Sequence, residues 1–128
     1  MITPSGVRER CAAWRESLMR GYFIDDQLLI TTLHHDDGVR LFGEVLGAHK
    51  APLALAVTEY ARTADEITVD LTRVDFLANG ALETLVALAR GLEPPQYLCL
   101  VAGAGLDLAE RLATRGWDAI DTLRLRVA

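Results

Sequence analysis

Two of the three histidines in this sequence stand directly before two aspartates in one short stretch, His34-His35-Asp36-Asp37. Imidazole and carboxylate groups are common metal ligands. Adjacent residues of a hairpin point to opposite faces, however, so these four side chains are poorly placed to converge on one ion. Asp37 and Gly38 also form a pair typical of tight turns. We interpret the stretch as a solvated turn and expect no metal site.

The chain has few serine and cysteine side chains that could act as catalytic nucleophiles. Ser5 and Ser17 are its two serines, and both lie in a predicted N-terminal helix. Cys11 and Cys99 are far apart and form no CxxC motif, which argues against a zinc site or a disulfide framework. Cys99 lies in a predicted strand and is expected to be a small buried apolar residue. His49 stands alone before a predicted helix and is interpreted as a surface residue, so we expect no catalytic residues, no cofactor and no enzyme.

Gly103 and Gly105 follow a predicted strand and precede a predicted helix. A dinucleotide-binding fingerprint needs a third glycine and a place in the first strand–helix unit, and this sequence has neither. The pair is therefore interpreted as a tight turn. Weak phosphate or anion binding at the helix start stays open, because helix N-termini attract anions.

Length, composition and charge narrow the function classes further. The chain has 128 residues, enough for one domain. Its hydrophobic fraction of 51% excludes intrinsic disorder, and its net charge of −5 argues against a general nucleic-acid binder. No apolar run reaches the roughly 18 residues of a membrane span, and the N-terminus has no signal-peptide pattern. We expect a cytoplasmic protein without nucleic-acid or membrane partners.

Hydrophobic periodicity predicts alternating helices and strands after an opening helix and hairpin. The expected helices cover residues 4–20, 51–62, 80–92 and 106–115, with Gly116 ending the last, and the expected strands cover residues 28–33, 39–45, 66–72, 96–102 and 122–127. The Asp37-Gly38 pair between the first two strands predicts an antiparallel hairpin. The fold class is therefore α/β, with a mixed sheet that is parallel except near the hairpin and with helices packed on it. In the strand over residues 66–72, we expect Ile67, Val69 and Leu71 to be more buried than Thr68 and Asp70.

Three stretches of the sequence resemble the STAS domain family, the fold of bacterial anti-sigma-factor antagonists. The first is residues 39–45, similar to the family's second strand with its Gly-Glu ending. The second is residues 69–77, similar to the strand and loop before the signature helix, and the third is that helix, over residues 78–88. The resemblance covers residues 28 to about 120, and it implies a regulatory protein-binding module.

The main departure from the family lies at the start of the signature helix. There the antagonists have Asp-Ser-Ser-Gly or Asp-Ser-Thr-Gly, whose hydroxyl is phosphorylated by a kinase that is also the anti-sigma factor. Residues 78–81 of this chain read Ala-Asn-Gly-Ala, so the hydroxyl position falls on Gly80. Thr84 is the nearest hydroxyl, one helical turn further on, and we expect it to lack the required geometry. Asn79 is expected to cap the helix through its side-chain oxygen.

The resemblance implies a partner-binding surface that lacks the phosphorylation switch. Its implied partner is a bacterial anti-sigma factor or a serine-kinase-like regulator. Two other functions stay open on the same fold: a small-molecule or anion-binding sensor, using the helix start near Asn79 or Gly105, and a structural assembly subunit. The expected partner-binding residues are Phe76, Leu77, Ala78, Asn79, Gly80, Ala81 and Glu83.

The N-terminal segment departs from the family as well. We interpret residues 1–22 as an amphipathic helical extension and residues 23–128 as the STAS-like domain. The apolar stripe of the extension is a possible oligomer interface, formed by Val7, Cys11, Trp14 and Leu18. A homodimer through this stripe is favoured. The alternative is docking on the same domain, in place of the C-terminal helix that usually closes the family fold and that this sequence does not show.

Overall fold

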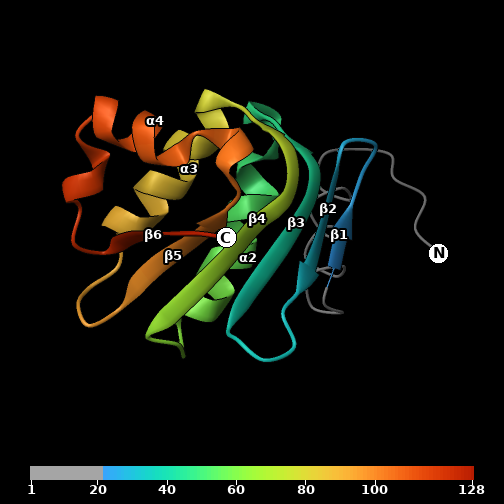
Figure 1. Ribbon diagram of the computed structural model, residues 1–128. Helices are drawn as coiled ribbons and strands as arrows, with labels where there is room; N and C mark the ends of the chain where they lie inside the picture. Colours follow the sequence, from blue (N-terminus) through green and yellow to red (C-terminus); the bar gives the residue numbers. More distant parts are fainter. Residues whose placement is uncertain (1–21) are drawn as a thin grey trace.

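The computed structural model describes residues 22–128, which form one mixed sheet of six strands in the order β1-β2-β3-β4-β5-β6 (Figure 1). The strands are β1 (Tyr22–Ile24), β2 (Leu28–Thr32), β3 (Gly38–Val45), β4 (Glu66–Leu77), β5 (Tyr97–Ala102) and β6 (Leu123–Val127). The helices are α2 (Lys50–Ala61), α3 (Asn79–Arg90) and α4 (Leu108–Thr114), with short 3-10 turns η1 (Gly47–His49), η2 (Ala104–Leu106) and η3 (Trp117–Ala119). The predicted N-terminal helix, with Val7, Cys11, Trp14 and Leu18, lies outside the described residues.

The antiparallel part of the sheet contains the predicted hairpin and one strand that the sequence did not predict. β2 pairs antiparallel with β3, and the turn between them closes with a 3.0 Å hydrogen bond from the Leu33 N–H to the Gly38 carbonyl. Gly38 has a φ of 148°, so the positive φ expected at this glycine is confirmed. β1 pairs antiparallel with β2 at the edge of the sheet. Its three residues are too few to show an alternating pattern, which explains why it was missed.

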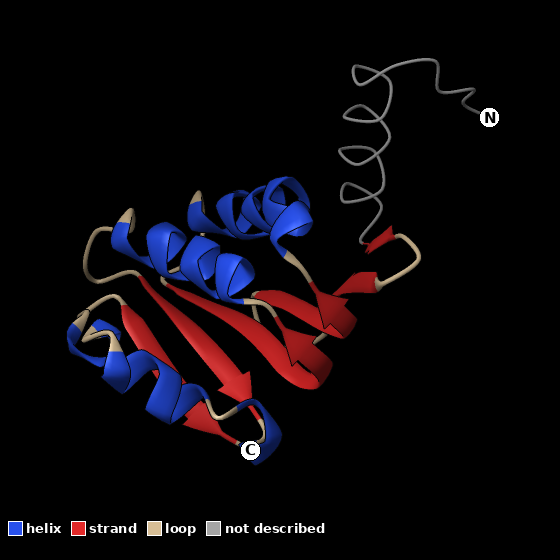
Figure 2. Cartoon of the chain, turned by 90° about the horizontal axis from the view of Figure 1, so that it is seen from above, coloured by secondary structure: helices blue, strands red, loops and turns tan. Residues whose placement is uncertain are grey.

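The rest of the sheet is parallel, as predicted. β3, β4, β5 and β6 pair in parallel, and each connection between them contains a helix. Figure 2 shows α2 and α3 side by side against the sheet, with α4 apart from them near the C-terminus. One predicted helix is shorter than expected, because residues 106–115 divide into η2 and α4. Asp107 adopts left-handed backbone geometry (φ 51°) between them, and Gly116 (φ 73°) follows the end of α4, as predicted.

One face of the sheet packs against the helices and forms the core. Register pairing places Val39, Val69, Leu100 and Leu125 in a row across four strands, and the first three of these side chains are at most 3% exposed. The helices add their own buried side chains to this face. Among them are Leu53, Val57, Leu82, Leu85, Leu108 and Leu112.

β4 differs from the prediction in length and in the burial of its second face. The expected order of burial is confirmed, since Ile67, Val69 and Leu71 are more buried than Thr68 and Asp70. Thr68 and Asp70 are nevertheless buried too, at 3% and 8% exposed. β4 lies in the middle of the sheet, where neighbouring side chains cover it from both sides. The strand also continues five residues beyond the predicted end, through a bulge, to Leu77.

Candidate functional site

The predicted partner-binding residues lie where β4 passes into α3, and the structure divides them into two groups. Three side chains point outward: Phe76 is 51% exposed, and Asn79 and Glu83 are also exposed. Leu77 and Ala81 are buried in the core, at 2% and 0% exposed. Their side chains hold the segment in place and leave only the backbone for contact with another molecule. Ala78 and Gly80 are partly exposed between the two groups.

Backbone geometry explains why this segment presents its surface as it does. Ala78 has extended backbone (φ −66°, ψ 152°) immediately before the first helical residue, and its N–H donates a 2.8 Å hydrogen bond to the carbonyl of Val45. The segment therefore stays attached to the end of β3 while α3 begins. The strand's alternation is carried to its last residues, so Leu77 points inward and Phe76 points to the opposite face.

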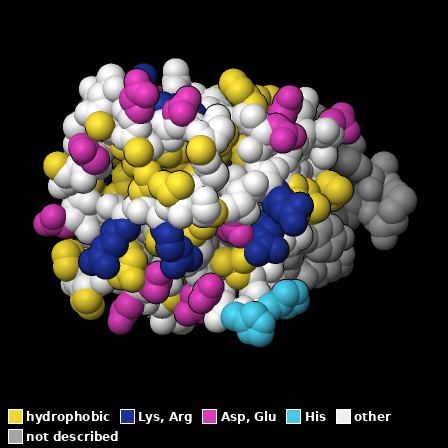
Figure 3. Space-filling model, viewed as in Figure 1, with side chains coloured by type: hydrophobic (Ala, Val, Ile, Leu, Met, Phe, Trp, Pro, Cys, Tyr) yellow, Lys and Arg dark blue, Asp and Glu magenta, His cyan; other side chains and the backbone are white. Residues whose placement is uncertain are grey.

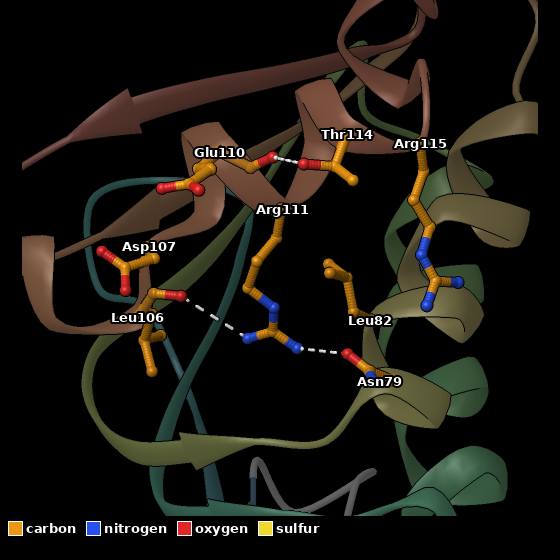
Figure 4. Close-up of a pocket in the computed structure, with 8 residues that line it drawn as sticks. All are labelled: Asn79, Leu82, Leu106, Asp107, Glu110, Arg111, Thr114 and Arg115. Atoms are coloured by element: carbon orange, nitrogen blue, oxygen red, sulfur yellow. Dashed lines mark hydrogen bonds between the residues drawn. The ribbon is translucent and has the colours of Figure 1, made fainter.

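Arg111 of α4 fastens this segment to the neighbouring helix, and the sequence reasoning missed it. Its Nη2 donates to the Leu77 carbonyl at 2.8 Å and to Asn79 Oδ1 at 3.0 Å, and its Nη1 lies 3.5 Å from the Leu106 carbonyl (Figure 4). A guanidinium group can bridge several acceptors because its five N–H donors form a rigid fork. Arg111 thus ties the end of β4, the start of α3 and the η2 turn together.

The expected capping role of Asn79 is wrong. Asn79 is the first residue of α3, Ala78 holds the cap position, and no side-chain hydrogen bond caps the helix. The Asn79 side-chain oxygen accepts from Arg111 instead. A residue already within the helix is placed past the position from which a side chain reaches back to the free N–H groups. Asn79 therefore links two helices at the site.

A groove of about 460 Å³ lies between α3 and α4 beside this segment. Its lining residues, drawn in Figure 4, are Asn79, Leu82, Leu106, Asp107, Glu110, Arg111, Thr114 and Arg115. Arg115 Nη1 also lies 3.0 Å from Glu83 Oε2, and its guanidinium stacks 5.0 Å from the Trp117 ring. Arg111 lies in α4 and Arg115 directly follows its last residue, and the spacing of four residues places both on one side of the helix. That spacing is the sequence signal that could have indicated their role.

The Thr84 hydroxyl is held inside α3. The residue is 9% exposed, and its Oγ1 donates a 2.9 Å hydrogen bond to the carbonyl of Gly80. A threonine that bonds back to the carbonyl four residues earlier has its hydroxyl directed along the helix. This hydroxyl is turned away from the surface that Phe76 and Asn79 share.

His49 is buried, so its interpretation as a surface residue is wrong. The residue is 3% exposed. Its Nδ1 accepts a 2.9 Å hydrogen bond from the Leu46 N–H, and its Nε2 lies 2.8 Å from Asp25 Oδ2. A backbone N–H can only donate, so Nδ1 is the acceptor and Nε2 carries the hydrogen that points at the carboxylate. Only the tertiary fold brings the β1–β2 turn, which contains Asp25, against η1.

Asp25 and Asp70 are two carboxylates whose pKa is lowered by their contacts in the fold. Burial by itself raises the pKa of Asp25, but hydrogen bonds from the N–H groups of Leu28 and Gln27 and from His49 outweigh it and hold this pKa below its ordinary value. Burial likewise raises the pKa of Asp70, and the opposing hydrogen bonds come from Thr72 and Arg40. Arg40 Nε lies 2.9 Å from Asp70 Oδ2. Both carboxylates are therefore structural anions.

The Asp25–His49 pair supports the candidate site from beneath. η1 contacts the first turn of α3, and a Cβ added at Gly80 would lie 3.4 Å from the Cα of Gly47. Gly80 thus allows a close approach of two backbones. Displacement of η1 would therefore disturb the start of α3 directly.

Other candidate chemistry remains dispersed in the described part of the chain. His34, His35, Asp36 and Asp37 are all exposed, and no group of three or more His, Cys, Asp or Glu within residues 22–128 is placed to hold a metal ion. Cys99 is 5% exposed, as predicted, and burial raises the pKa of its thiol. In the same residues, no helix is long and apolar enough to cross a membrane.

Comparison with known proteins identifies the fold. No family model and no curated protein sequence matches the chain. Among solved structures, the chain is similar to an anti-sigma factor antagonist from Mycobacterium paratuberculosis, with a TM-score of 0.64 and 22% sequence identity. The similarity covers 79% of this chain and 88% of that one. The expected STAS-like α/β fold is confirmed.

Proposed function

We propose that this protein is a non-catalytic regulatory module that binds another protein through the start of α3, without a phosphorylation switch. The observation that carries the proposal is the arrangement of Phe76. Its ring is 51% exposed on a segment that Arg111 and the Val45 carbonyl hold in place. A large apolar side chain on a fixed backbone is a typical anchor of a protein interface, because little conformational entropy is lost when it binds.

The proposed surface has an apolar centre and a polar edge. Phe76 and the partly exposed residues Ala78 and Gly80 form the centre, and Asn79 and Glu83 form the edge. Leu77 and Ala81 shape the surface from within. This combination is the usual anatomy of a protein interface.

The fold and the chemistry of the segment support the choice of partner class. The fold is that of an anti-sigma factor antagonist, so we propose a bacterial anti-sigma factor or a serine-kinase-like regulator as the partner. A phosphate would add about −1.5 to −2 charges to this surface. Residues 78–81 offer no hydroxyl, and the Thr84 hydroxyl is occupied within its helix. Binding is then controlled by the amount of each protein and not by phosphorylation.

The anion-sensor alternative has less support from the geometry. The groove between α3 and α4 has two arginines, but neither is free to bind an anion. Arg111 already donates to the carbonyls of Leu77 and Leu106 and to Asn79, and Arg115 pairs with Glu83. Asp107 and Glu110 add negative charge at the start of α4. An anion there would meet two carboxylates and few free donors.

Pairwise calorimetric titration tests the proposal. The purified protein is titrated with each histidine-kinase-like anti-sigma factor encoded in the same genome. We expect one of them to bind, and Phe76→Ala to weaken that binding at least about tenfold. Ile24→Ala is the matched control, because Ile24 is also a large exposed apolar residue, at 62%, on the β1 edge. Absence of binding to every such protein, or equal loss from both variants, would contradict the proposal.

A further inference from the structure

A second, more apolar groove lies on the opposite side of α4, against the edge strand β6. Its volume is about 260 Å³. Leu108 and Ala109 of α4 form one wall, and Leu125 and Val127 of β6 form the other. Val127 is 62% exposed and Ala109 is exposed, so the groove is open to a partner. Figure 3 shows hydrophobic side chains gathered on the face where α4 lies above β6 in Figure 1.

The residues that line this groove include two acidic side chains and no basic one. Asp107 and Glu110 lie on its rim. The described residues 22–128 contain 16 Asp and Glu against 9 Lys and Arg, which gives a net charge of −7. A partner with an apolar stripe and positive flanks would therefore match the groove both in polarity and in charge.

The N-terminal segment of this same chain has those two properties in its sequence. Its predicted stripe contains Trp14 and Leu18, and residues 1–21 carry four arginines against two glutamates, a net charge of +2. The arginines are Arg8, Arg10, Arg15 and Arg20. A tryptophan buries about 150–250 Å² and is among the commonest interface anchors.

We propose that the α4–β6 groove binds the N-terminal segment of a second copy of the chain. Trp14 of that segment is the anchor, and the arginines of the segment lie beside Asp107 and Glu110. The binding partner is thus another molecule of this protein. The surface around Phe76 takes no part in the contact, so this inference does not depend on the function proposed above.

The distance across the sheet favours the segment of a second copy over that of the same chain as the occupant of the groove. Tyr22 lies in β1, at the opposite edge of the sheet from β6. Five strand spacings separate the two edges, or about 24 Å. In the helix predicted over residues 4–20, Trp14 would lie only about 10 Å from Gly21. The Trp14 side chain of the same chain would then fall short of the groove, whereas a second copy has no such restriction.

Exchange between two copies also supplies the contact area that a dimer needs. A stable interface buries at least about 1,000 Å² in total, more than one helical stripe provides. When each copy places its segment in the groove of the other, a two-fold axis doubles the contact. The predicted 17-residue helix, about 25 Å long, is long enough to cover its groove along most of its stripe.

The molar mass of the full chain in solution, measured by light scattering over a range of concentrations, tests the proposal. We expect a dimer for the unmodified protein. Trp14→Ala and Ala109→Arg should each raise the dimer dissociation constant at least about tenfold, the second by placing a positive charge opposite the arginines. Ala87→Arg is the matched control, since Ala87 is an exposed alanine on α3 outside the groove. A monomer at all concentrations, or a dimer unaffected by Ala109→Arg, would overturn the proposal.

Cross-linking decides which copy fills the groove. In the full chain with Ala109→Cys, mild oxidation should join the new thiol to Cys11 of the second copy and yield a disulfide-linked dimer on a non-reducing gel. Ala87→Cys should not form this product. A disulfide between Cys11 and the new cysteine within one chain would show that the segment docks on its own domain, and the absence of any cross-link would also overturn the assignment.

Discussion

Two regions of this molecule are each held together by one polar side chain that reaches from another element. In the antiparallel region, His49 joins η1 to the β1–β2 turn through Leu46 and Asp25. In the helical region, Arg111 joins α4 to the end of β4 and the start of α3. Both side chains bond to backbone as well as to a side chain. They differ in burial, since His49 is buried and Arg111 is half-buried.

That difference separates a contact needed for folding from a contact that arranges a surface. When a buried hydrogen-bonding partner is removed, the group left behind keeps its full desolvation cost. When a half-exposed partner is removed, water can replace most of what was lost. We therefore expect the His49 contacts to govern stability and the Arg111 contacts to govern binding.

The largest effect is expected from His49→Ala. The substitution leaves the Leu46 N–H without its acceptor and Asp25 Oδ2 without its donor, and it removes a side chain that is only 4% exposed. We expect the free energy of unfolding to fall by about 2–3 kcal/mol, measured by urea denaturation. His34→Ala, in the exposed turn, is the control and should change it by less than about 0.5 kcal/mol. Equal effects from the two variants would remove the distinction drawn above.

A smaller loss of stability, with a clear effect on binding, is expected from Arg111→Ala. The variant should lose about 1 kcal/mol of unfolding free energy, because the carbonyls of Leu77 and Leu106 can turn to water. Binding to the regulator identified by titration should weaken at least about fivefold, since the segment carrying Phe76 is no longer fastened. Arg115→Ala is the control for stability, because its ion pair with Glu83 is exposed to solvent and of little net value. If Arg111→Ala destabilises the fold as strongly as His49→Ala does, both contacts serve folding.

Acid denaturation tests two further polar contacts, those of Asp25 with His49 and of Asp70 with Arg40. The pKa values of Asp25 and Asp70 lie below their ordinary value of 3.8 in the folded chain. Their contribution to stability is therefore complete above about pH 4 and is lost as the pH falls through the lowered pKa values. We expect the unfolding free energy to decline below about pH 4, and to decline less steeply in Asp70→Asn. An unchanged slope in this variant would show that the network around Arg40 does not favour the ionised carboxylate.

The smallest effect is expected from a kinase. Incubation of the protein with a serine kinase of the anti-sigma type and ATP should leave the intact mass unchanged, since residues 78–81 have no hydroxyl and Thr84 donates to Gly80. Gly80→Ser restores a hydroxyl at the family's position and should gain the mass of one phosphate. The added Cβ would lie 3.4 Å from Gly47, close enough that η1 must shift slightly. Phosphate on Thr84 in the unmodified protein would contradict the prediction.

Local patterns in the sequence were enough to predict most of the fold. Alternation over residues 66–72 predicted a strand, and the helical stripe of Leu82, Leu85 and Val86 predicted a helix over 80–92. Both depend on neighbours in the chain, because side-chain periodicity is a local property of the backbone. The Asp37-Gly38 turn and the parallel order of the later strands follow from equally local rules.

The contacts between distant residues were decided only by the tertiary structure. Asp25 and His49 are 24 positions apart, and Arg111 and Asn79 are 32 apart, so no local pattern connects them. A histidine before a helix and an asparagine at a helix start each have ordinary local roles, on the surface and as a cap. The fold overrode both roles by bringing a carboxylate or a guanidinium group within hydrogen-bond distance. The sequence by itself thus determined most of the elements and their order, whereas only the packed structure decided which polar side chains hold the candidate site in shape.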